Sequence, residues 1–243
     1  MAFAERVRSM RGLYVDLGFG AAAVTSAETL SRLRRLNPGL RVLGVEIDPA
    51  RVRDAQRVAR PGLEFRLGGF NLPLRAGEQV SVIRAFNVLR QYDEAAVGAA
   101  LAALFPALEP GGLLIEGTSD STGRLMAFEL HEATPAGLAR RAVVFAPTVD
   151  AVFAPRGLRA ILPKSHIHRA AVGGPVDRFF AAWHAAWLRA RRRGSDPRRA
   201  FVEAARDLAE GHGHAVDPRP TLLRRGFLLL GASWPEPGRS RAR

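Results

Sequence analysis

The sequence contains no cysteine, which excludes disulfide bonds, thiolate zinc sites and cysteine nucleophiles. Lys164 is its one lysine, so almost all of its positive charge comes from arginine. No apolar run approaches the roughly 20 residues of a transmembrane helix. Charged residues also interrupt the N-terminal segment MAFAERVRSMRG, where a signal peptide would be apolar. We therefore expect a cytoplasmic protein.

The composition is typical of a folded chain, with 47% hydrophobic and 24% charged residues among 243. The formal charge of +13 is distributed unevenly along it. Residues 1–120 carry 15 basic and 13 acidic side chains, whereas residues 121–243 carry 21 and 10. Because excess positive charge attracts phosphate groups, RNA is an alternative partner of the second half. Its densest basic cluster is formed by Arg189, Arg191, Arg192, Arg193, Arg198 and Arg199.

The first half alternates short apolar runs with longer helical patterns, which predicts a parallel sheet built from βαβ units. The expected strands are residues 13–16, 41–46, 63–67, 80–86 and 112–118, and the expected helices are residues 26–36, 49–58 and 94–108. The first of these helices would begin with a capping box of Thr25 and Glu28. Asp48 before Pro49 predicts the start of the second helix, and Asp93 that of the third.

The second half has a looser pattern. We expect further strands at residues 124–130, 141–146 and 226–233, and helices at residues 176–193 and 198–210. Apolar side chains recur at helical spacing in the first of these helices, which favours a packing face over a surface that stacks a substrate. These side chains are Val176, Phe179, Phe180, Trp183 and Trp187. Residues 235–243 are expected to form a disordered basic tail.

The most informative segment is the glycine loop that follows the first strand. Gly18 and Gly20 let the backbone turn and approach a ligand without a Cβ atom, at the strand end where doubly wound folds bind ligands. Asp16 is a carboxylate beside this crevice, which suits a cationic ligand and disfavours pyrophosphate. Glu46 ends the second strand, where a carboxylate can accept hydrogen bonds from ribose hydroxyls. Together they predict a binding site for a positively charged nucleoside.

An alternative is a dinucleotide such as NAD, because residues 18–23 also satisfy the pattern GxGxxA. Two features disfavour it. Asp16 would repel the pyrophosphate, and Glu46 lies 26 residues after Gly20 instead of about 20. The charged nucleoside is therefore the preferred interpretation.

Three motifs make residues 12–120 resemble the class I S-adenosylmethionine-dependent methyltransferases. They are the acidic-x-Gly-x-Gly loop at residues 16–20, the acidic end of the second strand at residues 45–49 and the turn Glu-Pro-Gly-Gly at residues 109–112. The resemblance implies a Rossmann-like, doubly wound, mostly parallel seven-stranded sheet with C-terminal helical embellishment. It also implies S-adenosyl-L-methionine as the cofactor, bound by Asp16, Gly18, Phe19, Gly20, Glu46, Ile47, Gly69, Phe70, Asn87 and Val88.

In this family the loop faces the methionine part of the cofactor, the residue at Glu46 faces the ribose and the residue at Ile47 faces the adenine. The chain departs from the family after the third strand, where Gly69 replaces a common acidic residue and leaves Phe70 or a backbone group to contact the adenine. Asn87, at the end of the fourth strand, could touch the cofactor or orient an acceptor. No catalytic residue can be named, because methyl transfer mainly requires alignment of the reactants.

Two histidine pairs, His166 with His168 and His212 with His214, could hold a metal if they converged. On a strand the members of the first pair would share a face. No acidic cluster is placed to complete a site, so we expect exposed loop histidines and no metal.

We thus predict one class I methyltransferase domain over residues 1–234, with a cofactor-binding half at 1–120 and an acceptor-side, sheet-completing half at 121–234. The predicted activity is methyl transfer from S-adenosylmethionine to an unidentified acceptor, with a small molecule favoured. The alternatives are an RNA methyltransferase that uses the basic second half and a non-catalytic protein that binds S-adenosylmethionine. The oligomeric state cannot be read from the sequence.

Overall fold

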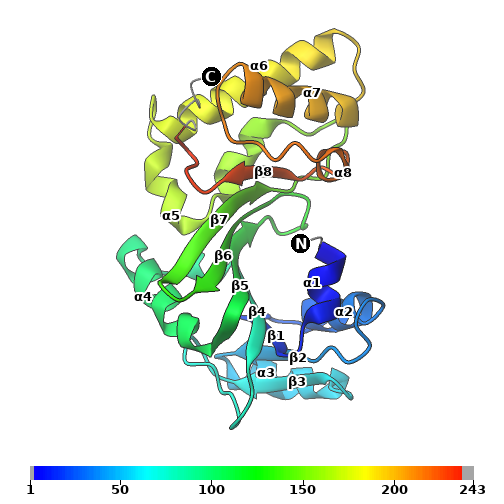
Figure 1. Ribbon diagram of the computed structural model, residues 1–243, viewed down its shortest axis with the longest axis vertical. Coiled ribbons are helices and arrows are strands. Elements are labelled where there is room, and N and C mark those ends of the chain that lie inside the picture. The colour runs from blue at the N-terminus through cyan, green and yellow to red at the C-terminus, as the bar shows by residue number, and fades with distance from the viewer. Residues whose placement is uncertain (1–2, 237–243) are drawn as a thin grey trace. The chain divides into compact units, whose positions relative to one another are not determined.

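The computed structural model describes residues 3–236, and its strands form one eight-stranded sheet in the order β3-β2-β1-β4-β5-β6-β7-β8 (Figure 1). The strands are β1 (Leu13–Leu17), β2 (Val42–Glu46), β3 (Leu63–Leu67), β4 (Val80–Phe86), β5 (Leu108–Ser119), β6 (Met126–Thr134), β7 (Gly137–Phe145) and β8 (Leu228–Gly231). The expected number of seven strands is therefore wrong by one, because all eight apolar runs join the same sheet.

The helices lie between these strands or near the ends of the chain. The α-helices are α1 (Phe3–Ser9), α2 (Val24–Leu33), α3 (Pro49–Ala55), α4 (Glu94–Leu104), α5 (Lys164–Ile167), α6 (Pro175–Arg192), α7 (Pro197–Glu210) and α8 (Pro220–Leu223). Short 3-10 helices occupy Gln56–Val58, Leu89–Gln91, Phe105–Ala107, Pro155–Ile161 and His168–Ala170.

The N-terminal part of the sheet is parallel, as the sequence predicts. Strand β1 pairs in parallel with β2 on one side and β4 on the other, and β2 pairs in parallel with β3. Every residue of β1 and β2 is buried, which explains their nearly continuous apolar sequences. Apolar residues of α1, α2 and α3 share one buried cluster with this sheet, and those of α4 share another. The predicted doubly wound α/β fold is confirmed.

The sequence signals for helix starts are confirmed for α3 and wrong for α2. The Asp48 carboxylate accepts hydrogen bonds from the backbone N–H groups of Ala50 and Arg51, so the predicted start of α3 is confirmed. The predicted capping box is wrong, because α2 begins at Val24 and no side chain caps it. Its acidic member, Glu28, instead forms an exposed ion pair with Arg32, 3.0 Å away. Asp93 precedes α4 as expected, but its side chain accepts no capping bond.

Strand β5 begins earlier than the sequence indicates. The expected turn at residues 109–112 lies inside the strand, and Gly111 adopts a positive φ of 78° within it. Further along, Thr134 donates a hydrogen bond from Oγ1 to the carbonyl oxygen of Gly137, 2.7 Å away, between β6 and β7. The strands expected at residues 124–130 and 141–146 correspond to β6 and β7, and β8 pairs antiparallel with β7.

The chain divides into two compact units. Unit 1 comprises residues 1–116 and 131–139, and unit 2 comprises residues 117–130 and 140–243. The long strands β5, β6 and β7 each contribute residues to both. Unit 1 holds all of the predicted ligand-binding residues.

The core of unit 2 is rich in aromatic rings. The predicted packing face of α6 is confirmed, because Val176, Phe179, Phe180, Trp183 and Trp187 are all at most 3% exposed. These side chains pack around Phe145 of β7, whose ring lies 5.4 to 5.8 Å from four other aromatic rings. Hydrophobic burial on this scale is the main source of stability in a fold.

No helix in residues 3–236 is long and apolar enough to span a membrane. The predicted tail lies mostly outside the described residues, which end at Glu236.

Candidate functional site

The candidate site lies where the order of the parallel strands reverses. Strand β1 has β2 on one side and β4 on the other, so the connections from β1 and from β3 leave in opposite directions. A crevice at the carboxyl ends of the strands forms at such a switch point, and ligands of doubly wound folds bind there. The predicted residues lie at or just after the carboxyl ends of β1, β2, β3 and β4.

Two glycines shape the loop after β1. Gly18 has a φ of +69° and Gly20 a φ of +81°, both in the region that favours glycine. The backbone N–H of Gly18 donates to the carbonyl oxygen of Val45, 2.7 Å away. A Cβ atom on Gly18 would lie 2.5 Å from Cγ2 of Val88, whereas one on Gly20 would meet nothing within 4 Å. Position 18 therefore requires glycine for conformation and space, and position 20 for conformation alone.

The Glu46 carboxylate holds this loop to the end of β2. Its Oε2 accepts a hydrogen bond from the backbone N–H of Gly20 at 3.0 Å. Its Oε1 accepts from the backbone N–H groups of Ile47 at 2.9 Å and Asp48 at 3.3 Å. A guanidinium nitrogen of Arg51 lies 3.7 Å from Oε2, and the Glu46 side chain is only 5% exposed. The structure thus brings Glu46 and the glycine loop together, as the motifs predict.

Asp16 differs from the expectation that it faces a cationic ligand. Its side chain is fully buried, and Arg84 of β4 donates to its Oδ1 at 2.8 Å. The hydroxyl of Ser26 in α2 donates to Oδ2 at 2.7 Å. The positive charge beside this carboxylate is therefore supplied by the protein itself, and Asp16 links β1, β4 and α2.

Arg84 carries the exposed part of this ion pair. Its side chain is 23% exposed, and the guanidinium carbon lies 4.2 Å from the centroid of the Phe86 ring. Tyr14, two residues before Asp16, is also buried, and burial together with the Asp16 charge raises the pKa of its hydroxyl. The carboxyl ends of β1 and β4 therefore present a partly exposed guanidinium that is paired with the buried Asp16 carboxylate.

The end of β4 contains the single non-glycine residue with a positive φ in residues 3–236, Asn87 at 61°. Asparagine tolerates this conformation better than most residues, at a cost of about 1 kcal/mol. Its carbonyl oxygen accepts a hydrogen bond from the Gln91 side chain, 3.2 Å away. The next residue, Val88, covers Gly18 as described above. Strain of this kind is common at functional sites, and it brings the chain after β4 over the glycine loop.

The other predicted residues have different environments. Phe19 is 7% exposed and packs edge-on against Phe65 at 5.1 Å, so it belongs to the core. Ile47 is 72% exposed and is available to a ligand. A Cβ atom on Gly69 would meet only a side-chain oxygen 3.8 Å away, and Phe70 packs edge-on against Tyr92 at 5.3 Å.

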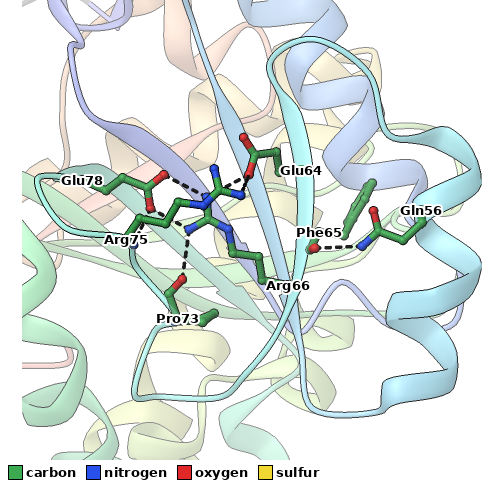
Figure 2. A network of polar contacts seen from close by, with 7 residues as sticks. All are labelled: Gln56, Glu64, Phe65, Arg66, Pro73, Arg75 and Glu78. Carbon is green, nitrogen blue, oxygen red and sulfur yellow. Dashed lines mark hydrogen bonds and ion pairs between the residues drawn. The ribbon is translucent and has the colours of Figure 1, made fainter.

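A network of charges orders the connection between β3 and β4 (Figure 2). Arg66 donates to both carboxylate oxygens of Glu78, at 2.6 and 2.8 Å, to Glu64 at 2.8 Å and to the carbonyl oxygen of Pro73 at 3.0 Å. The hydrogen bonds from Arg66 lower the pKa of Glu78 to about 2. This network fixes the segment that carries Gly69.

His212 is exposed in a turn as predicted, whereas His166 and His214 are buried. His166 lies in α5, not on a strand, and is 1% exposed. Its Nε2 is 2.7 Å from Oε1 of Glu129, which also accepts a hydrogen bond from Arg140 at 2.7 Å. His214 is 9% exposed, and burial lowers its pKa. Within residues 3–236, no group of three or more His, Cys, Asp or Glu side chains could hold a metal ion.

Three residues of the site were not predicted from the sequence. Ser26 and Arg84 bind Asp16, and Arg51 lies beside Glu46. Arg84 is 68 residues from Asp16 along the chain, so only the parallel pairing of β1 with β4 brings the two together. Arg51 lies in the first turn of α3, three residues after the predicted cap Asp48. This spacing is the sequence signal that could have placed Arg51 near the end of β2.

No family model matches the sequence, and the search of curated proteins found no match. Solved structures give distant likenesses. One is a TehB-like SAM-dependent methyltransferase from Corynebacterium glutamicum, at 20% identity over 49% of this chain and a TM-score of 0.36. Another is the O-methyltransferase NcsB1 of neocarzinostatin biosynthesis, at 22% identity over 49% and a TM-score of 0.36. A third is the dimethyltransferase RosA from Streptomyces davawensis, at 19% identity over 48% and a TM-score of 0.36.

The chain spans 63%, 34% and 36% of the lengths of these three proteins, respectively. Likenesses at these TM-scores do not assign a function.

Proposed function

We propose that unit 1 binds S-adenosylmethionine and that the protein transfers its methyl group to an acceptor, with a small molecule favoured. One observation carries this proposal. At the switch point of a parallel sheet, the Glu46 carboxylate is hydrogen-bonded to the Gly20 backbone of a loop that folds through two left-handed glycines. A carboxylate at the end of the second strand, beside a glycine loop, is suited to bind the hydroxyls of a ribose.

The local chemistry of Glu46 fits this role. A carboxylate oxygen can accept two hydrogen bonds. Oε2 has one hydrogen bond from the protein, the one from Gly20, so it retains capacity for a ribose hydroxyl. The space beside Gly20, where a Cβ atom would meet nothing within 4 Å, lets a ligand approach the backbone. Exposed Ile47, next in the chain, would then contact the adenine.

Asp16 acts in this proposal by positioning Arg84. Its buried carboxylate holds the guanidinium at the edge of β4, where 23% of the Arg84 side chain is exposed. A partly exposed guanidinium attracts a carboxylate, and the amino-acid end of S-adenosylmethionine carries one. Arg84 thus replaces Asp16 as the charged residue that would contact the methionine part.

S-adenosylmethionine supplies, when bound, a methyl group on a positively charged sulfur. The chain contributes binding and alignment, which are the main requirements of this reaction. Val88 covers Gly18 just after β4, so Val88 and the adjacent Asn87 would lie between the cofactor and an acceptor. No residue is assigned as a general base.

Calorimetric titration with S-adenosylhomocysteine, the demethylated product, tests the binding step. We expect saturable binding that Glu46→Gln weakens roughly tenfold or more, since a hydrogen bond to a charged group contributes about 1.5–3 kcal/mol. Glu28→Gln is the matched control, because it removes an exposed carboxylate of the same unit that pairs only with Arg32 on the surface of α2. Absence of binding to folded wild-type protein, or equal losses in both variants, would refute the proposal.

Methyl transfer itself is tested with radioactive S-adenosylmethionine and fractionated cell extract. We expect label to enter small molecules, and Glu46→Gln to reduce its incorporation. Label in RNA would instead identify a nucleic-acid acceptor. Cofactor binding without incorporation in any fraction would support the non-catalytic alternative.

A further inference from the structure

Two adjoining cavities in unit 2 form a surface that the proposed methyl transfer does not use. One has a volume of about 250 Å³ and lies between the segment around Pro147 and the end of α8. The other, of about 550 Å³, lies between α7 and α8. Arg198 and Arg224 line both cavities. We call the two cavities together the arginine groove.

The groove carries positive charge that unit 2 does not neutralise. Four exposed arginines line it without a carboxylate partner within 4 Å in residues 3–236: Arg198, Arg206, Arg224 and Arg225. Two acidic residues, Asp196 and Glu203, also line the larger cavity, and both are already engaged. Asp196 caps α7 by accepting hydrogen bonds from its first backbone N–H groups. Glu203 accepts from Arg193 and Arg199, at 3.0 and 2.9 Å.

Several other arginines of unit 2 have acidic partners. In three pairs the guanidinium nitrogen lies 2.6 Å from a carboxylate oxygen: Arg159 with Asp177, Arg189 with Asp207, and Arg219 with Asp217. Arg124 also pairs with Asp150. The groove differs from these paired sites because it gathers four arginines without a carboxylate partner in residues 3–236 along two adjoining cavities. Like charges held close together repel one another, and an anionic partner removes this cost.

The chemistry of the groove fits phosphate groups joined to flat rings. Guanidinium groups bind phosphate through paired N–H donors. The smaller cavity has apolar walls that include Phe227, Pro147 and Leu223 and no acidic residue, so it suits one unpaired base beside the arginines. The larger cavity continues past Arg198 and Arg224 to Arg206, one direction in which a strand could extend.

We propose that the arginine groove binds a single-stranded nucleic acid, with its phosphates on Arg198, Arg224 and Arg206 and one base in the cavity walled by Phe227. An excess of 21 basic over 10 acidic residues in unit 2 supports attraction of a polyanion over a wider surface. The groove lies wholly within unit 2, so its ligand can be tested apart from cofactor binding in unit 1.

Fluorescence anisotropy with a labelled single-stranded RNA of roughly 12 nucleotides tests this directly. We expect R198A/R224A to weaken binding at least about tenfold at about 0.1 M salt. Each lost phosphate contact should reduce the slope of log affinity against log salt by about 0.7, so this variant should lose about 1.4. Phe227→Leu should weaken binding with an unchanged salt slope, because it removes stacking without removing charge.

The matched control is R156A/R178A, which removes two exposed arginines of unit 2 outside the groove and gives the same net charge. We expect it to change affinity less than about twofold. All substituted arginines are exposed, and thermal melting checks that each variant folds. Equal losses in the two double variants would mean attraction by net charge alone and would overturn the proposal. The same holds if wild-type protein does not bind, or if polyglutamate or a mononucleotide binds the groove while the RNA does not.

Discussion

In unit 1 the buried carboxylates Asp16 and Glu46 accept hydrogen bonds from the unit itself, whereas in unit 2 four arginines of the groove have no carboxylate partner within residues 3–236. Unit 1 is nearly balanced, with 15 basic and 13 acidic residues, and unit 2 has 21 and 10. In unit 1 the buried charges therefore link the carboxyl ends of neighbouring strands to one another and to the segments beside them. Surface charge in unit 2 exceeds what that unit can pair, and it is available to an outside partner.

The same difference extends to the cores. Unit 2 derives its stability from packed aromatic rings, and unit 1 combines apolar strands with ion pairs that join them. Asp16 joins β1 to β4 through Arg84, and the Arg66 network joins β3 to the segment before β4. Substitutions can separate these two sources of stability.

The largest expected effect is on the core of unit 2. Phe145→Ala should lower the free energy of unfolding by about 3–5 kcal/mol, because it removes a fully buried ring and leaves a cavity among four other rings. Urea denaturation followed by tryptophan fluorescence measures the loss. Val152→Ala, at a side chain that is 82% exposed, is the control and should leave stability unchanged. A loss below about 1 kcal/mol for Phe145→Ala would contradict this view of the core.

The next effect concerns the buried ion pair of unit 1. Asp16→Asn should cost about 3 kcal/mol, because it leaves the Arg84 charge without its partner. Adding Arg84→Met should recover part of this loss, since the uncompensated charge is then removed. Urea denaturation of both single variants and the double variant gives the coupling. Additive losses would show that Asp16 and Arg84 act independently.

A smaller loss of stability is expected when a paired carboxylate is removed. It should be larger for Glu78 in unit 1 than for Glu203 in unit 2, and for Glu78 it should depend on pH. The pKa of Glu78 is lowered to about 2 by hydrogen bonds from Arg66, so its contribution is present above the ordinary glutamate pKa and is lost as pH falls toward 2. Glu78→Gln should cost about 2 kcal/mol at neutral pH and progressively less below about pH 4.5. Glu203→Gln in unit 2, where the surrounding ion pairs are exposed, should cost less than about 1 kcal/mol. Equal losses of stability for Glu78→Gln and Glu203→Gln at neutral pH would contradict this difference between the two units.

The smallest effect separates the two glycines of the loop. Gly20→Ala should cost about 1 kcal/mol, since it strains the left-handed backbone but meets no neighbouring atom. Gly18→Ala should cost more, because its Cβ atom would also collide with Val88. Thermal unfolding of both variants measures the difference. A larger loss for Gly20→Ala would show that the loop is not arranged as described.

The sequence was sufficient to predict the strands of unit 1 because each is a short apolar run bounded by polar residues. The strands at residues 63–67 and 80–86 have the predicted boundaries. The capping box failed because Thr25 and Glu28 match a local pattern, whereas α2 begins at Val24, two residues before the predicted start. Local signals thus locate elements more reliably than they locate the ends of helices.

Contacts between distant residues could not be predicted in the same way. Asp16 looked available to a ligand because its partner Arg84 is 68 residues away, on a strand with no recognisable charge pattern. The burial of His166 depends on Glu129 and Arg140, which reach it from β6 and β7. The arginine groove likewise joins residues of α7 to residues near α8. Such pairings require the strand order and the packing of helices.

Amide chemical shifts, followed by NMR during titration with S-adenosylhomocysteine, test the central claim most directly. We predict saturable shifts at Gly18, Gly20, Glu46, Ile47 and Asn87, with the amide of Gly20 among the largest because it is bonded to the carboxylate that receives the ribose. Amides of the arginine groove should not move. A titration in which the Gly20 and Ile47 amides stay fixed, or in which shifts occur only in unit 2, would contradict the account.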